Sequence, residues 1–247
     1  HFATQVVSIT KSLEYSQLLF MIDMKKIALL LAVALSSAAC FAQVNKSELK
    51  QLQNFLAQPA EKDGTNAEAL KITNLKDPST WEGITVVGNH VTEIKWKDKK
   101  LAGTLDLSGF KALAKVDVSR NKLAAVTFKG DPMLTDVNVS RNKLTEVDFT
   151  DCPTLVKIAV NNNRLTEFEI SDVPALKSLN IASNLLVALD LQSSSTLETL
   201  NCQSNHLESL SVTDCTALKN LYAGYNKLTS LNLVGTTNLQ NLNLDSN

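Results

Sequence analysis

The chain has 247 residues, with 24 basic and 25 acidic side chains and a formal net charge of −1. Such a balanced charge predicts no basic footprint for nucleic acid or for an anionic membrane. Hydrophobic residues make up 44% of the chain, which is enough to build a sizeable core.

The N-terminal region reads as an export leader. Residues 1–23 do not begin with Met and precede a complete signal, so we interpret them as a non-native upstream extension, with Met21 as an alternative start. Residues 24–42 contain a charged start, an apolar run over 27–35 and a tail of small residues ending at Ala42. This run is too short to span a bilayer, so it predicts an export signal and no transmembrane segment. Lipid attachment at Cys40 is an alternative to free secretion.

Residues 43–90 are predicted to form an N-terminal cap. Asn45 with Glu48 matches a capping box at the start of a helix. One apolar face then continues until Pro59, formed by Leu49, Leu52, Phe55 and Leu56. A second short helix is expected from Thr65. Further on, Gly88-Asn89 predicts a two-residue turn between strands at Ile84–Val87 and Val91–Trp96.

From residue 91 onward the chain repeats. Asparagines recur every 21 residues, at Asn121, Asn142, Asn163, Asn184, Asn205, Asn226 and Asn247. Apolar residues stand 8, 5 and 3 positions before each asparagine, and a leucine stands 2 positions after each of the first six. A period this constant predicts identical coils stacked in register, which share one continuous core at a spacing of about 4.8 Å. Apolar residues 5 and 7 positions after the asparagine predict a second short strand in each coil.

The pattern L-x-x-L-x-L-x-x-N-x-L resembles the leucine-rich repeat over roughly residues 91–247. The resemblance implies an α+β, mostly β fold: a curved solenoid with a parallel sheet on its concave face and a small helical cap. The short, helix-poor coils are similar to those of secreted bacterial leucine-rich repeat proteins, including the internalin type. Trp81–Val86 resembles the cap motif of plant-receptor repeats, with Val86 in the cysteine position. The first coil is irregular, because Lys99 replaces the asparagine.

The repeating asparagines invite a functional interpretation, such as sugar or calcium binding. A structural interpretation is stronger, because an Asn at a corner can hydrogen-bond the backbone of its own and the adjacent coil. We therefore assign all seven to a structural ladder. Since the chain stops inside a repeat at Asn247, we expect further sequence beyond it.

The cysteines predict neither a disulfide nor a metal centre. Cys152 and Cys215 occupy the same repeat position three coils apart, which places them about 14 Å from each other, beyond disulfide reach. Cys202 replaces an inward apolar residue and is expected to act as a small hydrophobe. His90 and His206 are isolated from each other, so the sequence offers no zinc cluster and no cofactor is implied.

The exposed side of the repeat strands is the candidate contact surface. In the N-terminal coils it carries alternating charge, and mutual pairing of Lys115, Asp136 and Lys157 would explain them without a ligand. In the C-terminal coils it is neutral and carries Tyr222, with Tyr225 nearby, residues suited to contact a protein or a glycan. An ordinary solvated sheet face explains these equally well. The candidate binding residues are Lys115, Asp117, Asp136, Asn138, Lys157, Asn180, Asn201, Asn220, Tyr222 and Tyr225.

Three functions are compatible with the sequence. The resemblance implies an exported, non-catalytic module that binds a protein or a cell-surface glycan. The chain shows no nucleophile–base pairing, no phosphate-binding loop and no paired carboxylates outside repeat positions, so it does not read as an enzyme. It could still be the targeting region of a larger exported enzyme, or a structural stalk on a cell surface.

Overall fold

The structure is a computed structural model that describes residues 44–170, 173–192 and 194–247. The predicted extension, the export signal and Cys40 lie outside these residues. Across the described ranges, no helix has both the length and the apolar character that a membrane crossing requires.

Two short helices open the described chain. Helix α2 (Lys46–Leu56) starts after Asn45, whose side chain accepts hydrogen bonds from the backbone N–H groups of Ser47 and Glu48. Helix α3 (Asn66–Ala69) follows Thr65, and a reciprocal capping box joins Thr65 to Glu68. A 3₁₀ turn, η2 (Pro78–Thr80), leads into the first strand. Both helices predicted from the sequence are confirmed.

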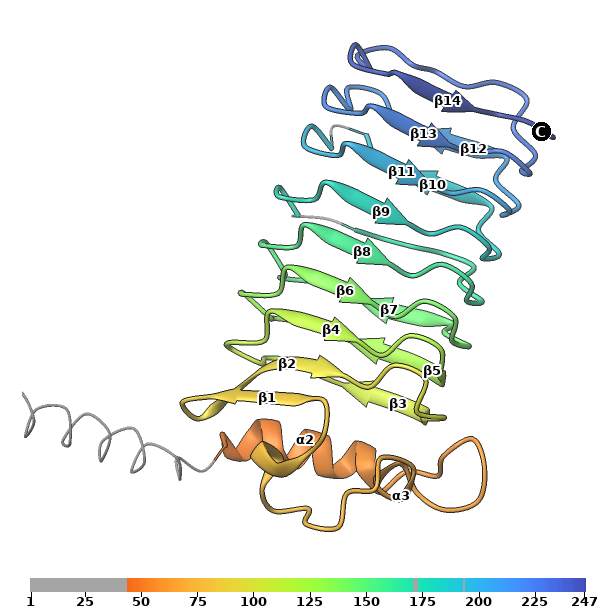
Figure 1. Ribbon diagram of the computed structural model, residues 1–247. Coiled ribbons are helices and arrows are strands. Elements are labelled where there is room, and N and C mark those ends of the chain that lie inside the picture. Colours follow the sequence, from red (N-terminus) through yellow and green to blue (C-terminus); the bar gives the residue numbers. More distant parts are fainter. Residues whose placement is uncertain (1–43, 171–172, 193) are drawn as a thin grey trace, which may run out of the picture. The chain divides into compact units, whose positions relative to one another are not determined.

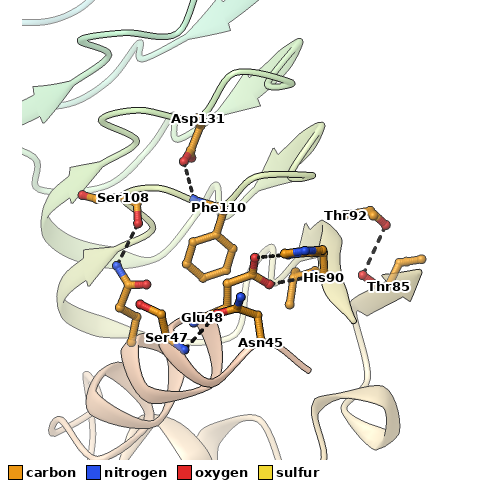
Figure 2. A network of polar contacts seen from close by, with 11 residues as sticks. Asn45, Ser47, Glu48, Thr85, His90, Thr92, Ser108, Phe110 and Asp131 are labelled. Atoms are coloured by element: carbon orange, nitrogen blue, oxygen red, sulfur yellow. Dashed lines mark hydrogen bonds and ion pairs between the residues drawn. The ribbon is translucent and has the colours of Figure 1, made fainter. Parts of the chain in front are cut away.

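The predicted capping box at Asn45 is only half correct. Glu48 does not return to the helix start, and its buried carboxylate crosses to the neighbouring hairpin instead. Its Oε1 lies 2.7 Å from His90 Nδ1, and its Oε2 accepts the backbone N–H of Val91 at 2.9 Å (Figure 2). The sequence pattern could not distinguish these partners, because a carboxylate at this position can satisfy N–H groups on either element. Glu48 therefore fastens α2 to the hairpin.

The hairpin is confirmed. Strands β1 (Ile84–Val87) and β2 (His90–Lys95) pair antiparallel, with Val87 opposite His90 and Gly88-Asn89 between them. Gly88 has a φ of 62°, the left-handed conformation that this two-residue turn requires. Trp96 follows β2, is fully buried, and stacks on Phe55 of α2 with ring centroids 5.9 Å apart. These contacts join the cap to the repeats.

Each following coil adds one parallel strand to a single sheet. Nine strands pair in the order β1-β2-β4-β6-β8-β9-β11-β13-β14, and they rise one above another in Figure 1. In this sheet, a residue of one repeat strand pairs with the residue 21 positions further along the chain, as Lys115 does with Asp136 and Asp136 with Lys157. The seven repeat strands are β4 (Lys115–Asp117), β6 (Asp136–Asn138), β8 (Lys157–Ala159), β9 (Ser178–Asn180), β11 (Thr199–Asn201), β13 (Asn220–Tyr222) and β14 (Asn241–Asn243).

The predicted second strand is present in most coils, but not in all. A three-stranded sheet contains β3 (Ala102–Asp106), β5 (Lys122–Thr127) and β7 (Glu146–Asp148). A separate pair contains β10 (Ala188–Asp190) and β12 (Ser209–Ser211). Residues 166–170, between these two sheets, form no strand. The apolar alternation marks which side chains turn inward, but it does not guarantee that the backbone ladder forms.

The core is a continuous column between the two layers of strands. The apolar positions before the first six asparagines are buried, for example Leu113, Val116 and Val118, whereas Leu242 of the last coil is 44% exposed. On the second side, Phe128 and Phe149 from adjacent coils stack with centroids 5.3 Å apart. The fold predicted from the repeat is confirmed: a mostly β solenoid of 21-residue coils with a parallel sheet and few helices.

The asparagines form a ladder of hydrogen bonds at one corner of the stack. The side chain of Asn163 donates to the carbonyl of Val160 in its own coil and to that of Val139 in the preceding coil. Its Oδ1 accepts the backbone N–H of Leu144, also in the preceding coil, at 3.1 Å. The first rung adapts to the irregular coil, because Asn121 accepts from both Lys99 and Leu101. Each asparagine thus satisfies backbone groups that the bend leaves unpaired.

Candidate functional site: the open face of the sheet

Two rows of side chains point away from the core on the nine-stranded sheet, and we call this surface the open face. Between the rows lies a buried residue of each repeat strand from β4 to β13, such as Val116, Val137 or Ile158. The first row contains Lys115, Asp136, Lys157, Ser178, Thr199, Asn220 and Asn241, and the second contains Asp117, Asn138, Ala159, Asn180, Asn201, Tyr222 and Asn243. The strand register therefore places predicted contact residues next to one another.

A groove of about 430 Å³ lies over the N-terminal half of the open face. It crosses β2, β4, β6, β8 and β9, and it contains the small side chains Ala159 and Ser178. Of the ten predicted contact residues, six line it: Lys115, Asp117, Asp136, Asn138, Lys157 and Asn180. Asn201, Asn220, Tyr222 and Tyr225 do not. The groove thus lies over the charged N-terminal part of the predicted surface and leaves out these four residues of its neutral C-terminal part.

The predicted pairing of Lys115, Asp136 and Lys157 is wrong. The three residues are neighbours in register. Among the ion pairs formed by described residues, none includes any of them. The carboxylate of Asp136 instead accepts a hydrogen bond from the hydroxyl of Thr135 at 2.8 Å. Long lysine side chains lose conformational entropy when they are fixed at a surface, so adjacency alone does not produce a pair. Both lysines are left with exposed side chains and no ion-pair partner.

Several side chains of the second row stabilise turns, a role that the sequence analysis did not identify. Asp117 accepts from both the backbone N–H and the hydroxyl of Ser119, at 3.0 and 2.6 Å. Asn138 makes the same two contacts with Ser140. Asn180 and Asn201 each accept the backbone N–H two residues ahead. These side chains close the turns after β4, β6, β9 and β11, so one oxygen of each is already engaged.

The polar groups of the C-terminal half satisfy one another. Asn220 donates to Thr199 Oγ1 at 3.1 Å and accepts from Asn241 at 2.6 Å. Tyr222 is half-buried between Asn201 and Asn243 in the strand register. Tyr225 lies beyond the strand, next to the asparagine corner, and is 62% exposed. This part of the open face forms a side-chain ladder, whereas the groove contains charges without partners.

Asp131 is a buried carboxylate that the sequence analysis missed. Its Oδ1 accepts the backbone N–H of Phe110 at 2.7 Å, as Figure 2 shows, while its Oδ2 has no hydrogen-bond partner among the described residues. Burial raises the pKa of Asp131 to about 8. The signal was available, because Asp131 occupies the inward position that Cys152 and Cys215 fill in later coils. Its position inside the stack assigns it to the scaffold.

The three cysteines of the described chain are free and buried. Burial raises the pKa of Cys202 to about 12 and that of Cys152 to about 11, so both thiols stay neutral and are poor nucleophiles. Cys152 and Cys215 donate weak hydrogen bonds to carbonyls of the preceding coil, at 3.0 and 3.1 Å. Within the described ranges, no group of three or more His, Cys, Asp and Glu residues could hold a metal ion.

Comparisons with known proteins give likenesses in solved structures. No protein-family model matches the sequence, and no curated protein matches it significantly. A functional domain of InlJ from Listeria monocytogenes is 21% identical with a TM-score of 0.45, over 76% of this chain and 48% of that one. The BIR2 ectodomain from Arabidopsis thaliana is 17% identical with a TM-score of 0.46, over 68% of this chain and 95% of that one.

A third likeness is the Toll–Spätzle complex of Drosophila, at 20% identity and a TM-score of 0.43. It covers 49% of this chain, which spans only 18% of the length of that chain. The similar structures are leucine-rich repeat proteins, and the likeness concerns the fold.

Proposed function

We propose that this chain is a non-catalytic binding module that holds a protein partner in the groove on the N-terminal half of the open face. The observation that supports this most is the pair of unpartnered lysines, Lys115 and Lys157, on either side of Asp136. Charged groups arranged in this way are available to pair across an interface, where they determine orientation and exclude wrong partners.

The shape of the groove supports the same proposal. Ala159 stands where the neighbouring coils have Asn138 and Asn180, so the row of larger polar side chains is interrupted there. A partner side chain can approach the sheet at this point, beside Lys157 of the same strand and two strands away from Lys115. The repeat scaffold holds both lysines on stacked strands, so binding does not require the backbone to rearrange.

A charge-reversal experiment tests the proposal. The mature chain is used to capture partners from extracts, and an identified partner is then titrated against Lys115→Glu/Lys157→Glu. We expect affinity to fall by about tenfold or more, since reversed charges repel where they previously attracted. The control Lys129→Glu/Lys227→Glu changes net charge equally at exposed positions outside the groove, and it should bind like the wild type.

A second variant separates the two halves of the open face. Asn201→Ala/Tyr222→Ala alters the C-terminal half and leaves the groove intact. Near-wild-type affinity for this variant, with loss for the lysine variant, supports the groove as the contact surface. Loss in the tyrosine variant alone would move the site to the C-terminal half and overturn our assignment.

We also propose that the chain is exported, on the strength of the sequence from Met24 to Ala42. The charged start, short apolar run and small-residue tail favour cleavage after Ala42. Mass spectrometry of the protein released by cells should find an N-terminus at Gln43. An acylated N-terminus at Cys40 would instead indicate a lipid-anchored form, and retention of the leader would contradict export by this signal.

A further inference from the structure

Although the chain is nearly neutral overall, the structure gathers cations along one corner. We call the set Lys100, Arg120, Lys122, Arg141, Lys143 and Arg164 the basic corner. Its residues flank the asparagine ladder in two rows, one position before and one position after the asparagine position of successive coils. The net charge of the chain did not predict this cluster, because net charge does not report how charges are distributed.

Backbone hydrogen bonds between coils fix these rows in register. In the row before the asparagines, Arg120 N donates to Ser140 O, and Arg141 N donates to Asn161 O, at 3.0 and 2.9 Å. In the row after them, the N–H groups of Lys122, Lys143 and Arg164 donate to the leucine that follows the cation of the preceding coil. Coil spacing is about 4.8 Å, so each row presents cations at a short and regular interval.

Most of these cations have no acidic partner. Within the described residues only Lys122 joins an ion pair, with Glu61 at 3.5 Å. Lys100, Arg120, Arg141, Lys143 and Arg164 are all exposed. Like charges placed directly opposite on neighbouring strands destabilise each other. An anion bound along the rows would relieve that repulsion.

The backbone conformation gives no reason for an arginine at positions 120 and 141. Arg120 and Arg141 have φ values of 58° and 57°, a left-handed conformation that disfavours most side chains and is adopted most readily by glycine and, after it, asparagine. The next coil does place an asparagine, Asn162, at the equivalent position. Scaffold stability alone would therefore favour Asn or Gly at Arg120 and Arg141.

The surroundings restrict the kind of anion. Glu146 and Glu167 are exposed only three residues beyond Lys143 and Arg164, so a broad anionic surface such as a membrane would also meet carboxylates. The aromatic residues of these coils, Phe110, Phe128, Phe149 and Phe168, are buried. Within the described residues of these coils, single-stranded nucleic acid would find no exposed aromatic ring to stack on, since the exposed Tyr225 lies about three coils beyond Arg164. A narrow chain with regularly spaced charges fits this corner better.

We propose that the basic corner binds a linear acidic polysaccharide, whose carboxylates or sulfates recur at a constant interval as the cations do. Its anionic groups pair with Arg120 and Arg141 in the first row and with Lys143 and Arg164 in the second. Guanidinium groups bind carboxylate and sulfate through two parallel hydrogen bonds, which gives the arginines a directional role. This site lies outside the groove and does not depend on the function proposed for it.

The test uses a fourfold variant, Arg120→Gln/Arg141→Gln/Lys143→Gln/Arg164→Gln, with polygalacturonate and heparin as probes. Wild-type protein should bind both at low salt and more weakly as salt rises, because the contacts are ionic. The variant should bind at least about tenfold more weakly, with a smaller salt dependence. Circular dichroism verifies that the variant remains folded.

A matched control removes the same charge elsewhere: Lys46→Gln/Lys50→Gln/Lys71→Gln/Lys76→Gln, at four exposed lysines of the cap. The control should bind both probes within about twofold of wild type. Equal loss in both variants would show a net-charge effect and overturn the proposal. So would absence of wild-type binding, or tighter binding to a polyglutamate peptide or to oligo-thymidine than to either polysaccharide.

Discussion

The two halves of the open face have the same backbone but different side-chain chemistry. In the N-terminal coils, Lys115 and Lys157 lie in a groove without ion-pair partners among the described residues. In the C-terminal coils, Thr199, Asn220 and Asn241 bond to one another. There Glu198 also bridges Lys177 and Lys219, at 3.6 and 2.7 Å. In the first half, charged side chains remain available to a partner. In the second half, most polar side chains already bond to one another.

This contrast separates scaffold from surface. The asparagine ladder and the buried leucines recur in both halves, because every coil must satisfy the same backbone groups and fill the same core. The exposed rows are not constrained in this way, so their composition can change from coil to coil. A position that departs from the scaffold's own needs is therefore the better guide to function.

The largest effect that would sharpen the comparison concerns Asp131, whose counterparts in the C-terminal coils are the uncharged Ser194, Cys215 and Thr236. Burial raises the pKa of Asp131 to about 8, whereas an unfolded aspartate titrates near ~3.9. Between these values the folded state holds a proton that the unfolded state has lost, so stability falls as pH rises. The slope reaches about 1.4 kcal/mol per pH unit and flattens above pH ~8.

Asp131→Asn removes this titration and keeps an oxygen for the N–H of Phe110. Urea unfolding of both proteins at several pH values gives the difference in free energy of unfolding, in which other titrating groups cancel. That difference should grow from acid to neutral pH, in favour of the variant. A difference that does not change with pH would show that Asp131 ionises normally inside the fold.

The next effect tests whether the scaffold is equivalent in the two halves. Asn163→Ala removes three hydrogen bonds to the backbone, and Asn205→Ala removes the same three from a C-terminal coil together with a longer fourth one, to the carbonyl of Gln203 at 3.4 Å. Leaving buried backbone groups unpaired should cost about 3 kcal/mol in each case. Chemical denaturation measures both, with exposed Thr145→Ala as a control that should change little. Unequal losses would mean that the asparagine ladder contributes differently to the free energy of unfolding in the two halves.

Much of the fold could be predicted from the sequence, because the 21-residue period repeats its information seven times. Spacing alone identified the inward leucines, the asparagine ladder and the strand register. Single elements were less certain. Glu48 matched a capping box but bonds to His90, and the apolar alternation at Phe168 and Ile170 gave no strand.

The candidate site was harder to predict. The sequence placed Lys115, Asp136 and Lys157 side by side, but it could not show whether long side chains would pair. It also could not show that the oxygens of Asp117 and Asn138 close turns, since this depends on side-chain conformation. Consecutive residues of the basic corner lie 2 to 21 positions apart in the sequence, and only the stacking of coils brings all six together. The sequence analysis therefore missed this cluster.

The smallest effect compares one paired lysine with one unpaired lysine. A hydrogen bond from Lys219 holds the pKa of Glu198 below its usual value, so Lys219→Met should raise that pKa toward the ordinary range. Lys115→Met should leave the pKa of Glu198 unchanged, since the ion pairs of Glu198 are with Lys177 and Lys219. NMR titration of the side-chain carboxyl groups reads both effects. An unchanged pKa of Glu198 after Lys219→Met would contradict the account of this ion pair.

The most direct test of the central claim is hydrogen–deuterium exchange of the mature chain with and without its bound protein partner. If the unpartnered charges mark the contact surface, protection on binding should concentrate in residues 93–180, around β4, β6, β8 and β9. Protection confined to residues 199–243 would place the partner on the C-terminal half, whose side chains bond to one another, and would contradict the account.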